Sequence, residues 1–191
     1  MMKDVFEQGR SYKDYFDYCV SQLKEGKSTN DNHSEAFLGY MRLGISRMKR
    51  GMRQIEVSEN LIAALNTTNI TNWLVISEGW CGDAGNILPL FEKCRELNLN
   101  LSIILRDTHP EIMDQYLTNG SRSIPMLIGF DNDFNEKFVW GPRPAYAQNM
   151  AMEHKSNPQT SQHDFYVRLQ QWYTSDKSDT IQKELVELLA V

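Results

Sequence analysis

Three cysteines, Cys19, Cys81 and Cys94, are the side chains of this sequence best suited to nucleophilic chemistry. An odd count of three excludes a disulfide framework and a four-cysteine metal site. Cys81 follows an apolar run and precedes a helical pattern, so we expect it at a strand-to-helix turn. Free N–H groups at the start of a helix stabilise a thiolate, whereas the carboxylate of Asp83 in the same turn disfavours one. Gly82 leaves the approach to the sulfur open, and Cys81 is therefore the candidate nucleophile.

Cys19 and Cys94 lie on apolar faces of expected helices, where a free cysteine usually packs as a small hydrophobic side chain. Cys94 comes 13 residues after Cys81, which corresponds to roughly 18–20 Å along a helix. A disulfide needs Cα atoms within about 7 Å, so these two cannot form one while the helix is intact. Cys19 belongs to another segment, and its proximity to Cys81 would turn a one-thiol site into a two-thiol site.

The elements expected around Cys81 alternate between strands and helices. Short apolar runs rich in β-branched residues predict buried strands at 72–77, 99–105, 124–130 and 137–140. A helical stripe covers 83–97, and the spacing of Thr108 and Glu111 is typical of a capping box before a short helix that ends near Leu117. This order predicts an α/β layer unit.

Both ends of the chain are predicted to be helical. An apolar stripe from Val5 through Cys19 to Leu23 indicates one first helix, and a second runs from about 38 to 55. Gly44 and Gly51 in the second helix would permit close packing of another element. Its other side carries basic residues with no acid between them, which is either a solvated face or a surface for anions or partners: Arg42, Arg47, Lys49, Arg50 and Arg53. Helices are also expected after Pro144, at 161–174 and at 179–190.

Composition excludes several classes of function. The chain has 191 residues and a net charge of −5, a balance that disfavours general nucleic-acid binding. No apolar stretch approaches the roughly 18 residues of a membrane span, and the N-terminus carries no secretory signal pattern. The four histidines are scattered without the short spacing of metal ligands, so we expect no metal or cofactor. These features predict a soluble, cytoplasmic protein, of open oligomeric state.

The segment 73–141 resembles the thioredoxin family. Trp80-Cys81-Gly82 matches the start of the Trp-Cys-Gly-Pro-Cys site, and Pro89, eight residues after Cys81, matches the proline that kinks the active-site helix. Pro125 follows Cys81 by 44 residues and is preceded by Ile124, as in the family's Ile-Pro, and Gly141 comes 16 residues later. The resemblance implies a thioredoxin-like fold with a four-stranded mixed sheet at 58–145, a helical extension at 1–57 and another at 146–191. It also implies that Pro125 is cis and faces Cys81, and that the last two strands are antiparallel.

Two departures from the thioredoxin pattern affect the chemistry. The second, resolving cysteine is replaced by Ala84, and the buried carboxylate that assists proton transfer is replaced by Val75. A two-thiol cycle needs that second thiol to expel the substrate from the mixed disulfide, so this site cannot complete it alone. Trp-Cys-Gly-Asp-Ala at 80–84, together with Trp-Gly-Pro-Arg-Pro at 140–144, resembles a bacterial branch of the superfamily.

Two functions remain. In the first, Cys81 attacks a disulfide-containing protein or a small-thiol adduct, and an external thiol releases it. The resemblance implies that the backbone of Ile124 pairs with bound substrate, while Arg122 and Arg143 could hold a carboxylate and Trp80 would cover the sulfur. In the second, the chain is a redox-inactive binding or adaptor module that uses its helical extensions and basic face. The expected site residues are Trp80, Cys81, Gly82, Asp83, Arg122, Ile124, Pro125 and Arg143.

Overall fold

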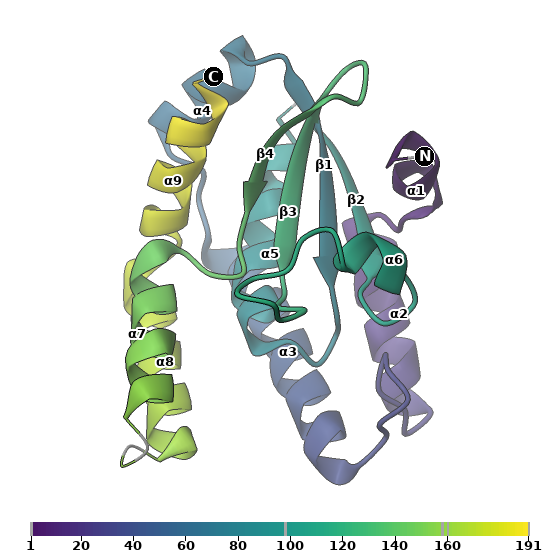
Figure 1. The fold of residues 1–191 in the computed structure, drawn as a ribbon, viewed down its shortest axis with the longest axis vertical. Helices are drawn as coiled ribbons and strands as arrows, with labels where there is room; N and C mark the ends of the chain where they lie inside the picture. The colour runs from purple at the N-terminus through teal and green to yellow at the C-terminus, as the bar shows by residue number, and fades with distance from the viewer. Residues whose placement is uncertain (1, 98, 158, 160, 191) are drawn as a thin grey trace.

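A four-stranded mixed sheet forms the centre of the computed structural model, which describes residues 2–97, 99–157, 159 and 161–190. Its strand order is β2-β1-β3-β4 (Figure 1). β1 pairs in parallel with β2 and antiparallel with β3, and β3 pairs antiparallel with β4, so the predicted fold class and the antiparallel last pair are confirmed. The strands are β1 (Ile70–Ser77), β2 (Asn100–Leu105), β3 (Met126–Asp131) and β4 (Glu136–Trp140).

The central strand β1 explains the long apolar run in the sequence. It is buried along nearly its whole length because strands lie on both of its sides and helices cover the sheet. It begins two residues earlier than predicted. β3 begins at Met126 rather than at 124, because Pro125 has no N–H to donate to a neighbouring strand.

Helix α5 (Gly82–Arg95) packs on one face of the sheet and is covered in turn by α3 (Glu35–Gln54) (Figure 1). The ring of Phe91 on α5 makes edge contacts with Trp73 on β1 at 5.7 Å and with Trp140 on β4 at 5.8 Å between centroids. The predicted close approach at Gly44 and Gly51 is confirmed. A Cβ at Gly44 would lie 2.7 Å from the Gly79 carbonyl oxygen, and a Cβ at Gly51 would meet the ring of Pro89.

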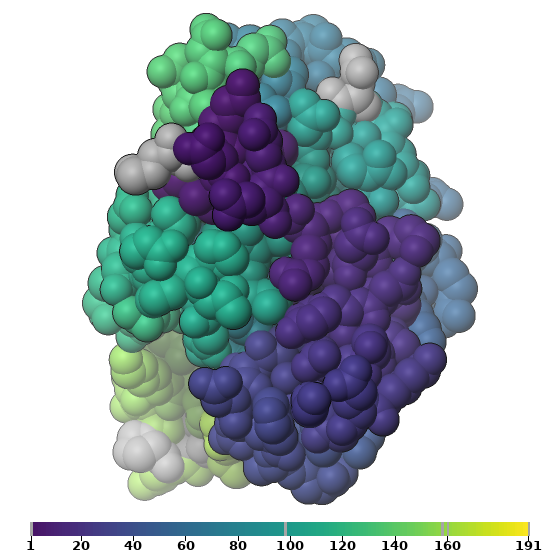
Figure 2. All heavy atoms as spheres, turned by 90° about the vertical axis from the view of Figure 1, so that its right-hand side faces the viewer, coloured from purple at the N-terminus to yellow at the C-terminus, as the bar shows by residue number. Residues whose placement is uncertain are grey.

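The N-terminal segment forms two helices rather than the single one predicted, α1 (Met2–Gln8) and α2 (Tyr12–Lys24). Between them Arg10 pairs with Ile103 of β2 through two backbone hydrogen bonds of 2.8 Å, which extends the sheet at that edge. Ser11 then caps α2 by accepting the N–H of Asp14 at 3.1 Å. Figure 2 shows this segment lying across the outside of the molecule and continuing into α3 below it.

The short helix α6 (Pro110–Met113) connects β2 to the approach to β3. The predicted capping box at Thr108 is wrong. The Thr108 hydroxyl donates instead to the Leu105 carbonyl at 3.2 Å, and His109 occupies the N-cap without a side-chain cap bond. The helix ends at Met113, four residues before the predicted end at Leu117.

The C-terminal helices pack beside the sheet rather than as a separate unit. α9 (Asp179–Leu189) lies along α4 (Glu59–Thr67), and α7 (Ala145–Ser156) pairs with α8 (Gln162–Asp176) (Figure 1). Gln182 on α9 accepts the Ser58 N–H at 2.7 Å, and Glu184 accepts the indole N–H of Trp140 at 2.6 Å. All three predicted segments share one hydrophobic core, with Cys19, Leu88 and Leu185 among its fully buried members. Within the described ranges no helix is long and apolar enough to cross a membrane.

Candidate functional site

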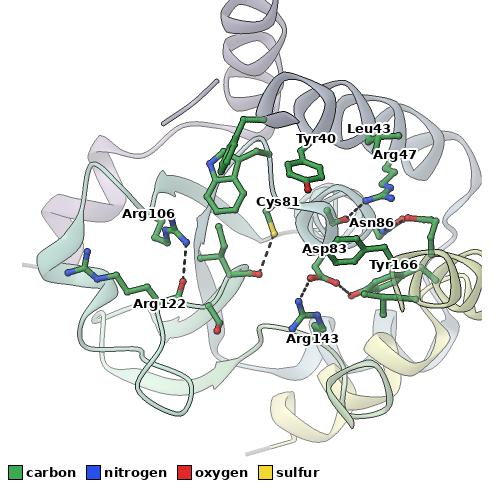
Figure 3. Close-up of a pocket in the computed structure, with 18 residues that line it drawn as sticks. Tyr40, Leu43, Arg47, Cys81, Asp83, Asn86, Arg106, Arg122, Arg143 and Tyr166 are labelled. Carbon is green, nitrogen blue, oxygen red and sulfur yellow. Dashed lines mark hydrogen bonds and ion pairs between the residues drawn. The ribbon is translucent and has the colours of Figure 1, made fainter. Parts of the chain in front are cut away.

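A cavity of about 370 Å³ lies at the C-terminal end of β1, where the chain turns into α5. Its walls come from the start of α5, from α3 and α8, and from the segments that precede β3 and follow β4. Figure 3 shows Cys81 near its centre, with Arg106 and Arg122 to one side and Arg47, Asp83 and Arg143 to the other. Cys81, the nucleophile that the sequence predicts, therefore lines the cavity.

Cys81 is the N-cap residue of α5, at the strand-to-helix turn that the sequence predicts. Its sulfur accepts the N–H of Ala84 at 3.5 Å, and its thiol donates to the carbonyl of Ile124 at 3.3 Å. Only 6% of the residue is exposed. Helix α5 begins at Gly82, one residue earlier than expected, so the thiol caps the helix directly.

The balance of effects on Cys81 favours the protonated thiol. The pKa of Cys81 is raised to about 12, with burial as the largest cause and the nearby carboxylate of Asp83 as the second. The N–H groups of Ala84 and Asp83 and the guanidinium of Arg143 act in the opposite direction. The sequence indicates the opposing effects of the helix terminus and Asp83, but it does not indicate burial, which decides the outcome.

Asp83 is held in a buried network beside the thiol. Arg143 forms an ion pair with it at 2.7 Å, and the hydroxyl of Tyr173 on α8 donates to it at 2.9 Å. Burial and this carboxylate together raise the pKa of Tyr173 well above its usual range, so the phenol stays protonated and donates. The guanidinium that was expected to hold a substrate carboxylate is thus paired with a carboxylate of the chain itself.

Arg122 and Trp80 lie on the opposite side of the cavity. Arg122 forms two bonds with Asp114, at 2.6 and 2.7 Å, so this arginine too already has a carboxylate partner. The indole of Trp80 is half-buried and is covered by the guanidinium of Arg106, 4.8 Å from the ring centroid. Phe37 of α3 contacts the same indole edge-on at 5.4 Å. Trp80 thus adds an aromatic side chain to the cavity that Cys81 also lines.

The Ile124–Pro125 bond is cis, as the resemblance implies. Ile124 lines the cavity, and its carbonyl oxygen accepts the hydrogen bond of the Cys81 thiol, whereas Pro125 is buried and does not line the cavity. Gly141 packs against this segment, and only glycine fits there. Its φ is +127°, and a Cβ would collide with the Pro125 carbonyl oxygen. Ile124 thus contributes to the cavity wall, while Pro125 and Gly141 support it from outside the cavity.

Sequence reasoning missed most of two cavity walls. Arg47 of α3 donates to the carbonyl of Gly82 at 3.2 Å, and its only sequence signal is its place in the acid-free basic face. On α8, Tyr166, Leu169 and Tyr173 line the cavity at helical spacing. The sequence predicts a helix at 161–174, but nothing in its pattern indicates that this helix lines a site.

All three cysteines are free and buried. Burial is the largest cause that raises the pKa of Cys19 and of Cys94 to about 12, and neither lines the cavity. The predicted core positions of both are confirmed. Among the described residues, no three or more His, Cys, Asp and Glu side chains are grouped so that they could hold a metal ion.

Comparison with known proteins gives a family and a fold. A family model described as thioredoxin matches residues 31–158, which includes α3 as well as the core predicted at 58–145. A protein of unknown function, PA1234 from Pseudomonas aeruginosa, is similar in structure, with a TM-score of 0.61, 16% identity, and coverage of 97% of this chain and 94% of that one. An HIV epitope-scaffold aligns with a TM-score of 0.55, 18% identity, and coverage of 95% and 98%. The comparison with curated proteins finds no match.

Proposed function

The chain belongs to the thioredoxin family, and on that premise we propose that it exchanges thiols and disulfides as a monothiol protein through Cys81. One observation carries the proposal: the sulfur of Cys81 caps α5 at the floor of a 370 Å³ cavity, beside the Ile124 carbonyl. A cavity of this size accepts a small molecule. The substrate would therefore be a small disulfide or a small-thiol adduct rather than a folded protein surface.

The reaction balances without an added oxidant. The sulfur of Cys81 attacks one sulfur of the substrate disulfide, an S–S bond forms, and the original S–S bond breaks. The proton that leaves Cys81 ends on the departing thiolate, so one small thiol is released. An external thiol then attacks the mixed disulfide and restores Cys81. Ala84 replaces the cysteine that would otherwise resolve it, and it is buried beneath the sulfur.

Burial makes the Cys81 thiol slow to react when no substrate is bound. Raising the pKa from 9.0 to about 12 lowers the thiolate fraction at pH 7 by about 1,000-fold. Each thiolate is in turn about 16- to 32-fold more nucleophilic because of its higher basicity. Together these two factors make the reaction of Cys81 roughly 30- to 60-fold slower than that of a free cysteine, for a reagent that the protein does not bind.

A comparison of two reagents tests the proposal. Iodoacetamide measures the intrinsic reactivity of Cys81, and the disulfide 3,3′-dithiodipropionate measures exchange, with mixed disulfides read by intact mass. We expect the rate ratio of disulfide to iodoacetamide to exceed the ratio for a free cysteine. We also expect the adduct to be absent from Cys81→Ser and to be released by 2-mercaptoethanol. A ratio equal to that of free cysteine would refute catalysed exchange.

The alternative is a thioredoxin-fold binding module without redox turnover. The burial of Cys81, with its raised pKa, favours it, because buried thiols of this kind are usually inert. Val75, fully buried where thioredoxin has a carboxylate, also removes a proton acceptor. Two measurements would separate the functions. The exchange function predicts small-thiol adducts, read by intact mass, that need Cys81, whereas the binding module predicts protein partners that are captured from lysate and survive Cys81→Ser.

We place the chain in the bacterial branch that carries Trp-Cys-Gly-Asp-Ala at 80–84, and in the cytoplasm. The free cysteines favour that compartment, because glutathione and thioredoxin systems keep its thiols reduced. The same pool would supply the external thiol that resolves Cys81.

A further inference from the structure

One arginine that lines the cavity beside Cys81 makes no ion pair within the part of the chain that the structure describes. Four arginines line it, and three of them form ion pairs within the chain. Arg47 donates to the Gly82 carbonyl, and it makes no ion pair with an acid of the described residues. The paired arginines and their partners are Arg106 with Asp107, Arg122 with Asp114, and Arg143 with Asp83.

Close packing fixes the position of Arg47. A Cβ at Gly82 would lie 2.7 Å from the Nη1 atom of Arg47, and a Cβ at Gly85 would lie 3.2 Å from its Cβ. Because neither glycine has a side chain, α3 can approach the start of α5 closely. The guanidinium of Arg47 therefore lies over the turn that holds Cys81.

Burial is the largest cause that lowers the pKa of Arg47, and the charge of Arg50 lowers it as well. The carboxylate of Asp83 acts in the opposite direction, but its ion pair is with Arg143. An anionic ligand in the cavity would give Arg47 a direct ion-pair partner.

The rim of the cavity is apolar. Tyr40 and Leu43 of α3 and Tyr166 of α8 line it, and each is more than 40% exposed. Figure 3 shows Arg47 beside these rim residues, on the side of Cys81 away from Arg106 and Arg122. A ligand that fills the space from the rim to the sulfur therefore needs a short apolar body and a negative charge.

We propose that the cavity selects low-molecular-weight disulfides that carry a carboxylate, with Arg47 pairing the carboxylate while a sulfur lies against Cys81. This inference rests on the proposed exchange function and names its substrate class. A guanidinium pairs a carboxylate through two parallel hydrogen bonds, which fixes orientation as well as charge.

A pair of disulfides of opposite charge tests the selectivity. 3,3′-Dithiodipropionate is a dianion, and cystamine is a dication of similar length. We expect the wild-type protein to form the mixed disulfide about tenfold faster with the dianion, once each rate is divided by that of free cysteine. The preference should vanish in Arg47→Gln. It should persist in the matched control Arg53→Gln, which removes the same charge from an exposed position of α3 that does not line the cavity.

A second measurement separates this inference from the exchange function. Suberate has the length and charge of 3,3′-dithiodipropionate but no sulfur, so it binds without reacting. NMR titration of suberate into Cys81→Ser should shift signals of α3 and α5, and adding Arg47→Gln should weaken binding about tenfold. Suberate binding without exchange would support the anion site and overturn the exchange function. Exchange without charge preference, or no suberate binding, would overturn the anion site, and circular dichroism confirms that each variant is folded.

Discussion

Replacing Asp83 with Asn should make Cys81 more reactive, although it removes a buried ion pair. Asn has nearly the same shape and keeps an oxygen that can accept the Tyr173 hydroxyl. The variant loses the carboxylate that raises the pKa of Cys81, and it frees the guanidinium of Arg143, now paired with that carboxylate at 2.7 Å. Both changes favour a thiolate, so the pKa of Cys81 should fall.

The size of the effect follows from the charge that is removed. One nearby charge typically moves a pKa by about 1 to 3, and we use the same size for the removal of the Asp83 carboxylate. This would bring the pKa of Cys81 from about 12 to about 9–11. Each unit raises the thiolate fraction tenfold and lowers the reactivity of each thiolate about threefold. The reaction with iodoacetamide at pH 7 should therefore accelerate roughly 3- to 60-fold.

Peptide-level mass spectrometry of iodoacetamide-treated protein can follow Cys81 and Cys94 in one sample. Cys94 is the internal control, because only burial raises its pKa. We expect Asp83→Asn to accelerate Cys81 and to leave Cys94 unchanged. Unchanged or slower reaction at Cys81 would refute the electrostatic reasoning. An equal acceleration at both cysteines would show that the variant loosens the core.

Two further predictions concern the packing and the charge behind the site. Gly44→Ala places a Cβ 2.7 Å from the Gly79 carbonyl oxygen and should cost about 1–3 kcal/mol, whereas Gly39→Ala, with no described atom within 4 Å, should stabilise α3 by up to about 1 kcal/mol. Equal changes of Tm in the two variants would contradict this. Burial raises the pKa of Glu78 from 4.5 to about 7, so the folded state keeps a proton that the unfolded chain releases, and stability should fall as pH rises from about 4.5 to 7. Urea unfolding at pH 5 and at pH 8 measures this effect. Between these pH values the free energy of unfolding should fall by about 2–3 kcal/mol more for wild type than for Glu78→Gln. An equal fall in both proteins would exclude this role of Glu78.

The fold was predictable because its main signals are local. The apolar run of β1, the turn at Cys81 and the Ile124–Pro125 pair each specify backbone conformation within a few residues. Such signals can be read from the sequence without knowing how distant segments pack. The break between α1 and α2 was missed because the apolar stripe continues through it, and only the backbone pairing of Arg10 with Ile103 reveals it.

The chemistry of the site was less predictable because it depends on contacts between distant segments. Asp83 meets Arg143 and Tyr173 across 60 and 90 residues of chain, and Arg47 reaches Gly82 across 35. No periodicity or motif encodes those pairings. The burial that raises the pKa of Cys81 arises in the same way, from α3 and α8 closing over the start of α5.

The two helices that slow the thiol also create the space that could make its reaction selective. The rate deficit of roughly 30- to 60-fold corresponds to about 2 kcal/mol of activation free energy. Holding a disulfide in line with the sulfur can contribute about 7–11 kcal/mol through proximity and orientation. Because the second quantity is the larger, a bound disulfide can react faster than at a free cysteine while unbound electrophiles react more slowly. A cavity that places a carboxylate on Arg47 and a sulfur at Cys81 would thus replace thiol activation by substrate positioning.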